Sequence, residues 1–229
     1  MMSSDRSAIA WRAAQDIIDG SYVNLGIGIP TLVPAFVPAG REIVYQSENG
    51  LLGVGPPPLP GAADPDLINA SKDPITLQPG AAVFDSALAF GIMRGGHLGL
   101  ALLGAFEVDV EGSVANWTLD RGEPPPGVGG AMDLAVGARE IWVLMEHSDR
   151  SGRPRILERC VLPLTARGVA QRIYTDLAVM TIERDRCLMV HELNESVTPD
   201  ELRARTGAAL RFSNQLRALR QPRTGEQIC

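Results

Sequence analysis

Two continuous apolar runs limit most strongly the folds that this chain can adopt. They cover residues 98–108 and residues 141–145, and they lack the polar–apolar alternation of a strand with one face in water. Runs of this kind are typical of strands that helices cover on both faces, as in a parallel sheet. We therefore expect an α/β fold with an open, mostly parallel sheet and flanking helices.

Segments with helical spacing alternate with these strands. Apolar residues recur at helical intervals over residues 4–19, and Gly20 supplies a stop. A strand is expected over residues 22–26, and Pro30 fits the first turn of a short helix. The other expected elements are a helix capped by Asp85 and closed by Gly95 and Gly96, a helix over residues 131–136, strands over residues 176–182 and 187–192, and a helix with a capping box formed by Thr198 and Glu201.

We expect a single domain. Residues 1–212 contain all of the periodic segments, and no internal repeat divides them. The tail, residues 213–229, is polar and has no periodicity. Segments of that composition bury too little apolar surface to fold, so we expect the tail to be disordered.

Composition excludes several classes of function. The chain carries 27 acidic and 21 basic residues, a net charge of −6, whereas nucleic-acid binding needs a basic surface. No apolar run approaches the roughly 18 residues of a membrane-spanning helix. The first residues also lack the pattern of a signal peptide, so we expect a cytoplasmic protein without a membrane partner. Cysteines and histidines are few and scattered, and we expect no metal site.

One carboxylate has the setting of a reactive group. Glu48 lies in a Ser-Glu-Asn-Gly turn between the β-prone residues 42–45 and a loop rich in glycine and proline. A side chain at the end of a strand is held in position yet can be reached by a ligand. The same setting also suits an ordinary solvated glutamate, and the residues alone favour that explanation.

The segment Gln-Ser-Glu-Asn-Gly-Leu-Leu-Gly, residues 46–53, resembles the active-site signature of the β subunits of family I CoA-transferases. Further segments match that family in the same order along the chain: residues 24–31, 66–70, 93–97, 103–106, 115–117 and 127–135. The resemblance covers roughly residues 5–212. It implies the α/β fold of a CoA-transferase β subunit.

The resemblance assigns roles to individual residues. Glu48 would be the nucleophile that carries CoA as a glutamyl thioester. The backbone N–H groups of Gly129 and Gly130 would stabilise the oxyanion; without the resemblance, a tight loop before a helix is the commoner explanation. The residues expected to bind substrate or CoA are Asn24, Gly26, Gly28, Asn49, Gly50 and Arg94.

The resemblance also implies a reaction and a partner. A CoA thioester would be the substrate, with no permanently bound cofactor, and an α subunit would complete the CoA cleft in a heterodimer or an α2β2 assembly. Residues 117–126 lack lysine and are similar to enzymes that move CoA from succinyl-CoA to 3-oxoadipate. Acetoacetate is the alternative acceptor.

A second alternative is a protein that hydrolyses or cleaves CoA thioesters on the same fold. The intact turn around Glu48 disfavours it, because such relatives tend to lack the nucleophile. One residue departs from the family pattern: Glu107 stands where relatives usually carry glutamine. If Glu107 lined the acid pocket, its charge would disfavour a dicarboxylate substrate.

Overall fold

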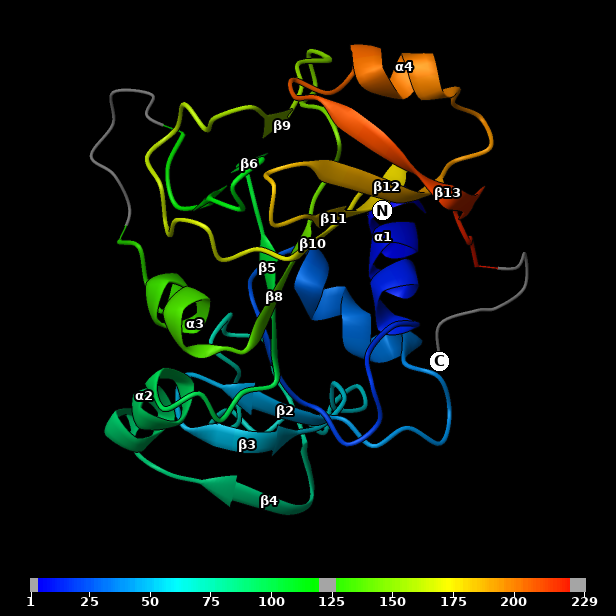
Figure 1. The fold of residues 1–229 in the computed structure, drawn as a ribbon. Helices are drawn as coiled ribbons and strands as arrows, with labels where there is room; N and C mark the ends of the chain where they lie inside the picture. Colours follow the sequence, from blue (N-terminus) through cyan, green and yellow to red (C-terminus); the bar gives the residue numbers. More distant parts are fainter. Residues whose placement is uncertain (1–3, 120–126, 223–229) are drawn as a thin grey trace.

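Ten strands of the described residues form one sheet (Figure 1). The computed structural model describes residues 4–119 and 127–222. From edge to edge the strands are β13 (Leu210–Ala218), β12 (Leu188–Leu193), β11 (Ala178–Ile182), β10 (Arg172–Tyr174), β8 (Glu140–Leu144), β5 (Leu100–Gly104), β1 (Tyr22–Leu25), β2 (Val44–Ser47), β3 (Leu51–Val54) and β4 (Leu77–Val83). The central strands β10, β8, β5, β1 and β2 are parallel, and antiparallel pairs flank them. The prediction of an α/β fold is confirmed.

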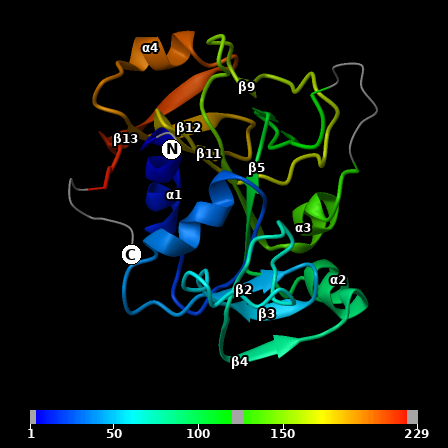
Figure 2. The same ribbon diagram turned by 180° about the vertical axis from the view of Figure 1, so that it is seen from behind.

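Helices cover both faces of the central strands. On one face lie α1 (Ser4–Ala14) and the 3-10 helix η1 (Ile29–Phe36), and on the other lie α2 (Ser86–Arg94) and α3 (Ala131–Gly137) (Figures 1 and 2). Leu100 and Leu102 of β5 pack in the core on the α1 side, while Ala101 and Leu103 pack with α2 and α3. This burial on two faces explains why β5 is apolar along its whole length. None of the helices in the described part of the chain has the length and apolarity to cross a membrane.

Two predicted boundaries are wrong for physical reasons. The run over residues 98–108 is not one strand, because beyond Gly104 the N–H of Phe106 donates to the carbonyl of Ala115 (2.8 Å). The chain thereby enters a second sheet of β7 (Val114–Ala115), β6 (Glu107–Asp109) and β9 (Ile156–Leu157). The first helix ends at Ala14 and not at residue 19. Its apolar spacing continues into a turn in which Ile17 is still buried.

The C-terminal segment is more ordered than its composition indicates. The last helix, α4 (Pro199–Ala204), begins with the predicted capping box, in which Thr198 and Glu201 each bind the other's backbone N–H. Strand β13 then pairs parallel with β12 and extends to Ala218, so the prediction of disorder is wrong for residues 213–218. Most side chains of β13 are exposed, and backbone pairing holds a strand that has no apolar period. Residues 223–229 of the predicted tail lie outside the described residues.

A buried ion pair joins the first helix to a strand near the end of the chain. Arg12 of α1 and Glu192 of β12 are 4% and 2% exposed. The Nε and Nη2 groups of Arg12 donate to the two carboxylate oxygens of Glu192, both at 2.7 Å. Nη1 of Arg12 lies 2.8 Å from Oδ1 of Asp16. Burial acts to raise the pKa of Glu192, but the hydrogen bonds from Arg12 lower it overall, so the pair is ionised.

Replacing Arg12 by methionine is expected to destabilise the protein strongly. Glu192 would remain buried without its partner, which costs about 3–5 kcal/mol of unfolding free energy. Urea unfolding measures the loss. The matched control is Arg153→Met, which removes an exposed pair with Asp149 and should cost less than about 1 kcal/mol. Equal and small losses for both variants would contradict a structural role for the Arg12–Glu192 pair.

Candidate active site

Glu48 is presented by a tight turn between two hairpin strands. Strand β2 ends at Ser47 and β3 begins at Leu51, and the N–H of Gly50 donates to the carbonyl of Ser47 (3.1 Å). Gly50 has a φ of 107°, and a side chain there would overlap the carbonyl oxygen of Phe84. The turn therefore requires glycine at this position. The next chain segment also holds it, because Nδ2 of Asn49 donates to the carbonyl of Ile68 (2.7 Å).

The carboxyl end of β1 forms the adjacent wall of the site. Asn24 is 3% exposed, and its Nδ2 group donates to the backbone oxygen (3.1 Å) and the side-chain Oε1 (2.5 Å) of Gln46. These bonds join β1 to β2 directly before Glu48. Gly26 then donates its N–H to Leu102 of β5 (2.7 Å), and a side chain at Gly26 would lie 2.9 Å from that carbonyl oxygen. Glycine thus allows the backbone leaving β1 to stay close to β5.

The loop before α3 closes on the Glu48 carboxylate. Gly130 is the N-cap of α3, and a β-carbon added there would overlap Oε2 of Glu48. At the other end of the helix, a side chain at Gly137 would overlap the carbonyl oxygen of Met93 in α2. Close packing of α3 on α2 therefore fixes the loop against Glu48. Among the described residues, none accepts a hydrogen bond from the N–H of Gly129 or of Gly130.

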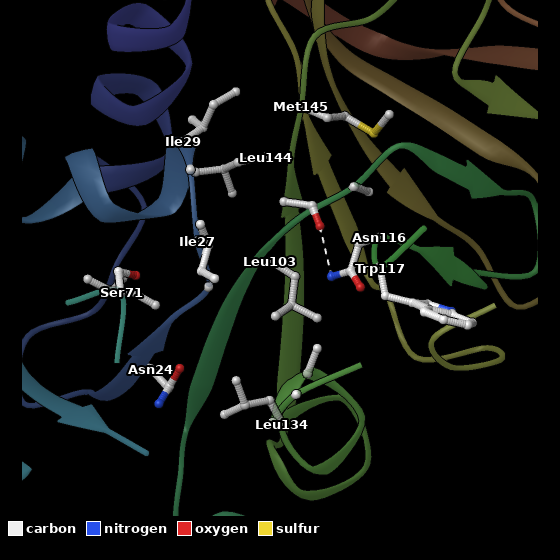
Figure 3. A pocket seen from close by; sticks show the side chains of 18 of the residues that line it. Asn24, Ile27, Ile29, Ser71, Leu103, Asn116, Trp117, Leu134, Leu144 and Met145 are labelled. Carbon is white, nitrogen blue, oxygen red and sulfur yellow. Dashed lines mark hydrogen bonds between the residues drawn. The ribbon is translucent and has the colours of Figure 1, made fainter. Parts of the chain in front are cut away.

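These walls enclose a cavity of about 520 Å³ (Figure 3). The predicted residues that line it are Asn24, Gly26, Gly28, Glu48, Gly129 and Gly130. Figure 3 shows side chains that sequence reasoning did not find, among them Leu103, Leu134 and Met145. The figure also shows Asn116, whose Nδ2 donates to the carbonyl of Gly104 (3.0 Å).

The Glu48 carboxylate occupies a setting that disfavours its charge. Burial raises its pKa above the ordinary value, and the negative charge of Asp133 raises it further. In the part of the chain that the structure describes, no donor forms a hydrogen bond to this carboxylate. A half-buried carboxylate without donors is a stronger nucleophile than a solvated one, because no hydrogen bond has to be broken before it attacks.

Comparison with known proteins identifies the family. A profile described as coenzyme A transferase matches residues 6–204. The chain belongs to the coenzyme A transferase family. The reaction of the family uses a CoA thioester as substrate, and the chain is accordingly part of an enzyme.

Relatives of the family align along nearly their whole length. The β subunit of succinyl-CoA:3-ketoacid coenzyme A transferase from Helicobacter pylori is 48% identical over 203 residues, which is 89% of this chain and 97% of that protein. The β subunit of 3-oxoadipate CoA-transferase from Pseudomonas putida is 48% identical over 205 residues, 90% of this chain and 95% of that protein. The acyl-CoA transferase (YdiF) apoenzyme of Escherichia coli O157:H7 shares the fold, with a TM-score of 0.73, 19% identity and coverage of 93% of this chain and 43% of that one.

Three predicted CoA-binding residues do not line the cavity. Asn49 and Gly50 hold the turn behind Glu48, and Nε of the exposed Arg94 binds Oδ1 of Asp133 (2.5 Å). A direct contact of these residues with CoA stays a prediction. Glu107 also lies outside the cavity lining, because its carboxylate accepts hydrogen bonds from the N–H groups of Val161 (2.8 Å) and Leu162 (2.9 Å). Residues 120–126, part of the segment that indicates the substrate, lie outside the described residues.

Replacing Gly130 by alanine is expected to impair activity far more than stability. The added β-carbon displaces the flexible end of Glu48 and leaves the backbone in place. A shift of about 1 Å in a reacting group can reduce the rate roughly 100-fold, so kcat should fall by about that factor. The control is Gly91→Ala in α2, which has open space around it and should keep full activity. A Gly130→Ala enzyme with normal kcat would show that the close approach has no part in the reaction.

Replacing Asp133 by asparagine is expected to shift the pH dependence. Removal of the negative charge lowers the pKa of Glu48, which must be ionised to attack, so the acidic limb of kcat/KM moves to lower pH. Arg94→Gln is the control, because it breaks the same ion pair but keeps the charge of Asp133. Its acidic limb should not move to lower pH. An unchanged limb in Asp133→Asn would contradict the electrostatic coupling.

Proposed function

We propose that this chain is the β subunit of a CoA-transferase that moves CoA from succinyl-CoA to a 3-oxo acid, with 3-oxoadipate as the preferred acceptor. The observation that carries the proposal is the position of Glu48, whose carboxylate lies in the cavity against the backbone of Gly130. The relatives named for 3-oxoadipate and for 3-ketoacids support this substrate class. The position of Glu107 outside the cavity lining removes the objection to a dicarboxylate.

The transfer proceeds through covalent intermediates on Glu48. A carboxylate oxygen of Glu48 attacks the acyl carbonyl of succinyl-CoA, the new C–O bond forms, and the C–S bond breaks to release CoA as a thiolate. The thiolate then attacks the carbonyl of Glu48 in the mixed anhydride. Succinate leaves with its electron pair, and a glutamyl-CoA thioester remains. The acceptor carboxylate repeats these steps in reverse order and leaves as its CoA thioester.

Each step passes through a tetrahedral oxyanion that needs fixed donors. The N–H groups of Gly129 and Gly130, which no acceptor among the described residues occupies, adjoin Glu48 and suit this role without reorganisation. Asn24 contributes differently. Its Nδ2 group is already bound to Gln46, so the atom that remains for a ligand is the acceptor Oδ1. That oxygen suits an amide N–H of the pantetheine arm of CoA.

An α subunit is required for this reaction in our proposal. Each of these relatives is named as one subunit of its enzyme, which implies a second subunit there. The cavity of about 520 Å³ accommodates an acyl group and the thiol end of pantetheine. The nucleotide part of CoA needs further surface, and an α subunit would supply it. Acetoacetate remains the alternative acceptor on the same chemistry.

Mass spectrometry of the complex with its α subunit tests the covalent step. Incubation with succinyl-CoA without acceptor should add one CoA to the peptide that contains Glu48. Glu48→Ala should form no adduct and lose at least about 1000-fold in kcat. Arg153→Met, outside the cavity, serves as the control and should form the adduct normally. Release of free CoA by Glu48→Ala at the normal rate would instead indicate a hydrolase or lyase.

A further inference from the structure

Three charged side chains line the cavity outside the machinery around Glu48. They are Arg6 of α1, Glu146 directly after β8, and Arg155 directly before β9. Nε of Arg6 donates to Oε1 of Glu146 at 3.2 Å, and Nη1 of Arg155 lies 3.6 Å from Oε2, too far for a direct hydrogen bond. Two guanidinium groups thus share one carboxylate. The cluster has a net positive charge and donors available to an anionic ligand.

The strand order separates this cluster from Glu48. Strands β2, β1, β5 and β8 are consecutive neighbours, Glu48 follows β2, and Glu146 comes soon after β8. Three spacings of about 4.8 Å place the two strand ends about 14 Å apart. In Figure 3, Met145, the neighbour of Glu146, lies at the opposite end of the cavity from Asn24. A substrate that reacts at Glu48 can therefore direct its far end toward the cluster.

The wall between the two ends is apolar. Leu103, Leu144 and Met145 contribute it, with Ile27 exposed on the opposite side. Such a wall suits the methylene groups of an acyl chain. A chain that has a reacting carboxyl at one end and passes this wall meets guanidinium groups at the other end. The complementary ligand group there is a second carboxylate.

We propose that Arg155 and Arg6 bind the distal carboxylate of a dicarboxylic acyl group and thereby select succinyl-CoA and 3-oxo diacids over monocarboxylic counterparts. The inference rests on the proposed function, because it assumes that the acyl group reacts at Glu48. The planar guanidinium matches a carboxylate with two parallel hydrogen bonds. Glu146 orients both arginines while neutralising only one of the two charges.

The backbone around Arg155 is rigid enough for such a subsite. The N–H of Arg155 donates to the carbonyl of His147 (3.2 Å), and its carbonyl accepts from the N–H of Val108 (3.0 Å). The Arg155 side chain is 23% exposed, whereas that of Arg153 on the same loop is 81% exposed and binds Asp149 outside the cavity. Arg155 is therefore the principal ligand, and Arg153 offers a matched control.

Two acyl donors of equal length test the proposal. Succinyl-CoA and butyryl-CoA share the four-carbon chain and all phosphates of CoA, and they differ in the distal carboxylate. The rate of CoA adduct formation on Glu48 is measured with both donors in complexes that contain wild-type chain, Arg155→Gln, Arg6→Gln or Arg153→Gln. Arg155→Gln should reduce kcat/KM for succinyl-CoA roughly 10- to 100-fold and leave that for butyryl-CoA within about twofold.

The other outcomes separate the explanations. Equal losses with both donors would overturn the proposal and indicate that the arginines bind the phosphates of CoA or only stabilise the fold. Normal kinetics of Arg155→Gln and Arg6→Gln with both donors would overturn the subsite and leave the transferase proposal intact. Absence of any adduct in the wild-type complex would overturn both proposals. Arg153→Gln should match the wild-type chain throughout.

Discussion

The site depends on the divergence of the chain on either side of β1. From β1 the chain passes through η1 to β2 on one side, and it returns through α2 to β5 on the other. Connections that diverge in this way leave a crevice at the carboxyl ends of neighbouring parallel strands, which is where ligands bind in open α/β sheets. The bond from Gly26 to Leu102 joins β1 and β5 at the base of this crevice. The reactive carboxylate, the glycine loop and the apolar wall are all arranged around it.

Around the crevice, backbone packing holds side chains where solvation alone would not place them. Glu48 loses hydration on folding, and its raised pKa records that loss. The turn persists because Gly50 fits beneath Phe84 and because α3 is packed on α2 through Gly137. Elsewhere the fold stabilises its buried charges by pairing, as in Arg12 and Glu192. The two carboxylates differ in their partners: Glu192 is bound by a cation, and Glu48 remains available to react.

Sequence reasoning succeeded where the signal is local and failed where distant segments meet. Strand β5 was predictable because both of its faces are buried, and α4 because its capping box spans four residues. Strand β13 was missed because pairing with β12, not side-chain burial, holds it. Glu48 was found through a contiguous motif. Arg6 and Arg155 lie far apart in the sequence, and only the fold brings them to one cavity.

The two ends of the cavity are built from different elements, and this separates chemistry from substrate choice. Glu48 and its glycine neighbours belong to the β2–β3 turn and the loop before α3. The charged cluster belongs to α1 and the segment between β8 and β9. Substitutions in the second group alter the charge at the far end of the cavity without moving the carboxylate or its backbone donors. One fold can therefore retain a glutamyl intermediate while its relatives accept different acids, because the carboxyl that reacts is common to all of them.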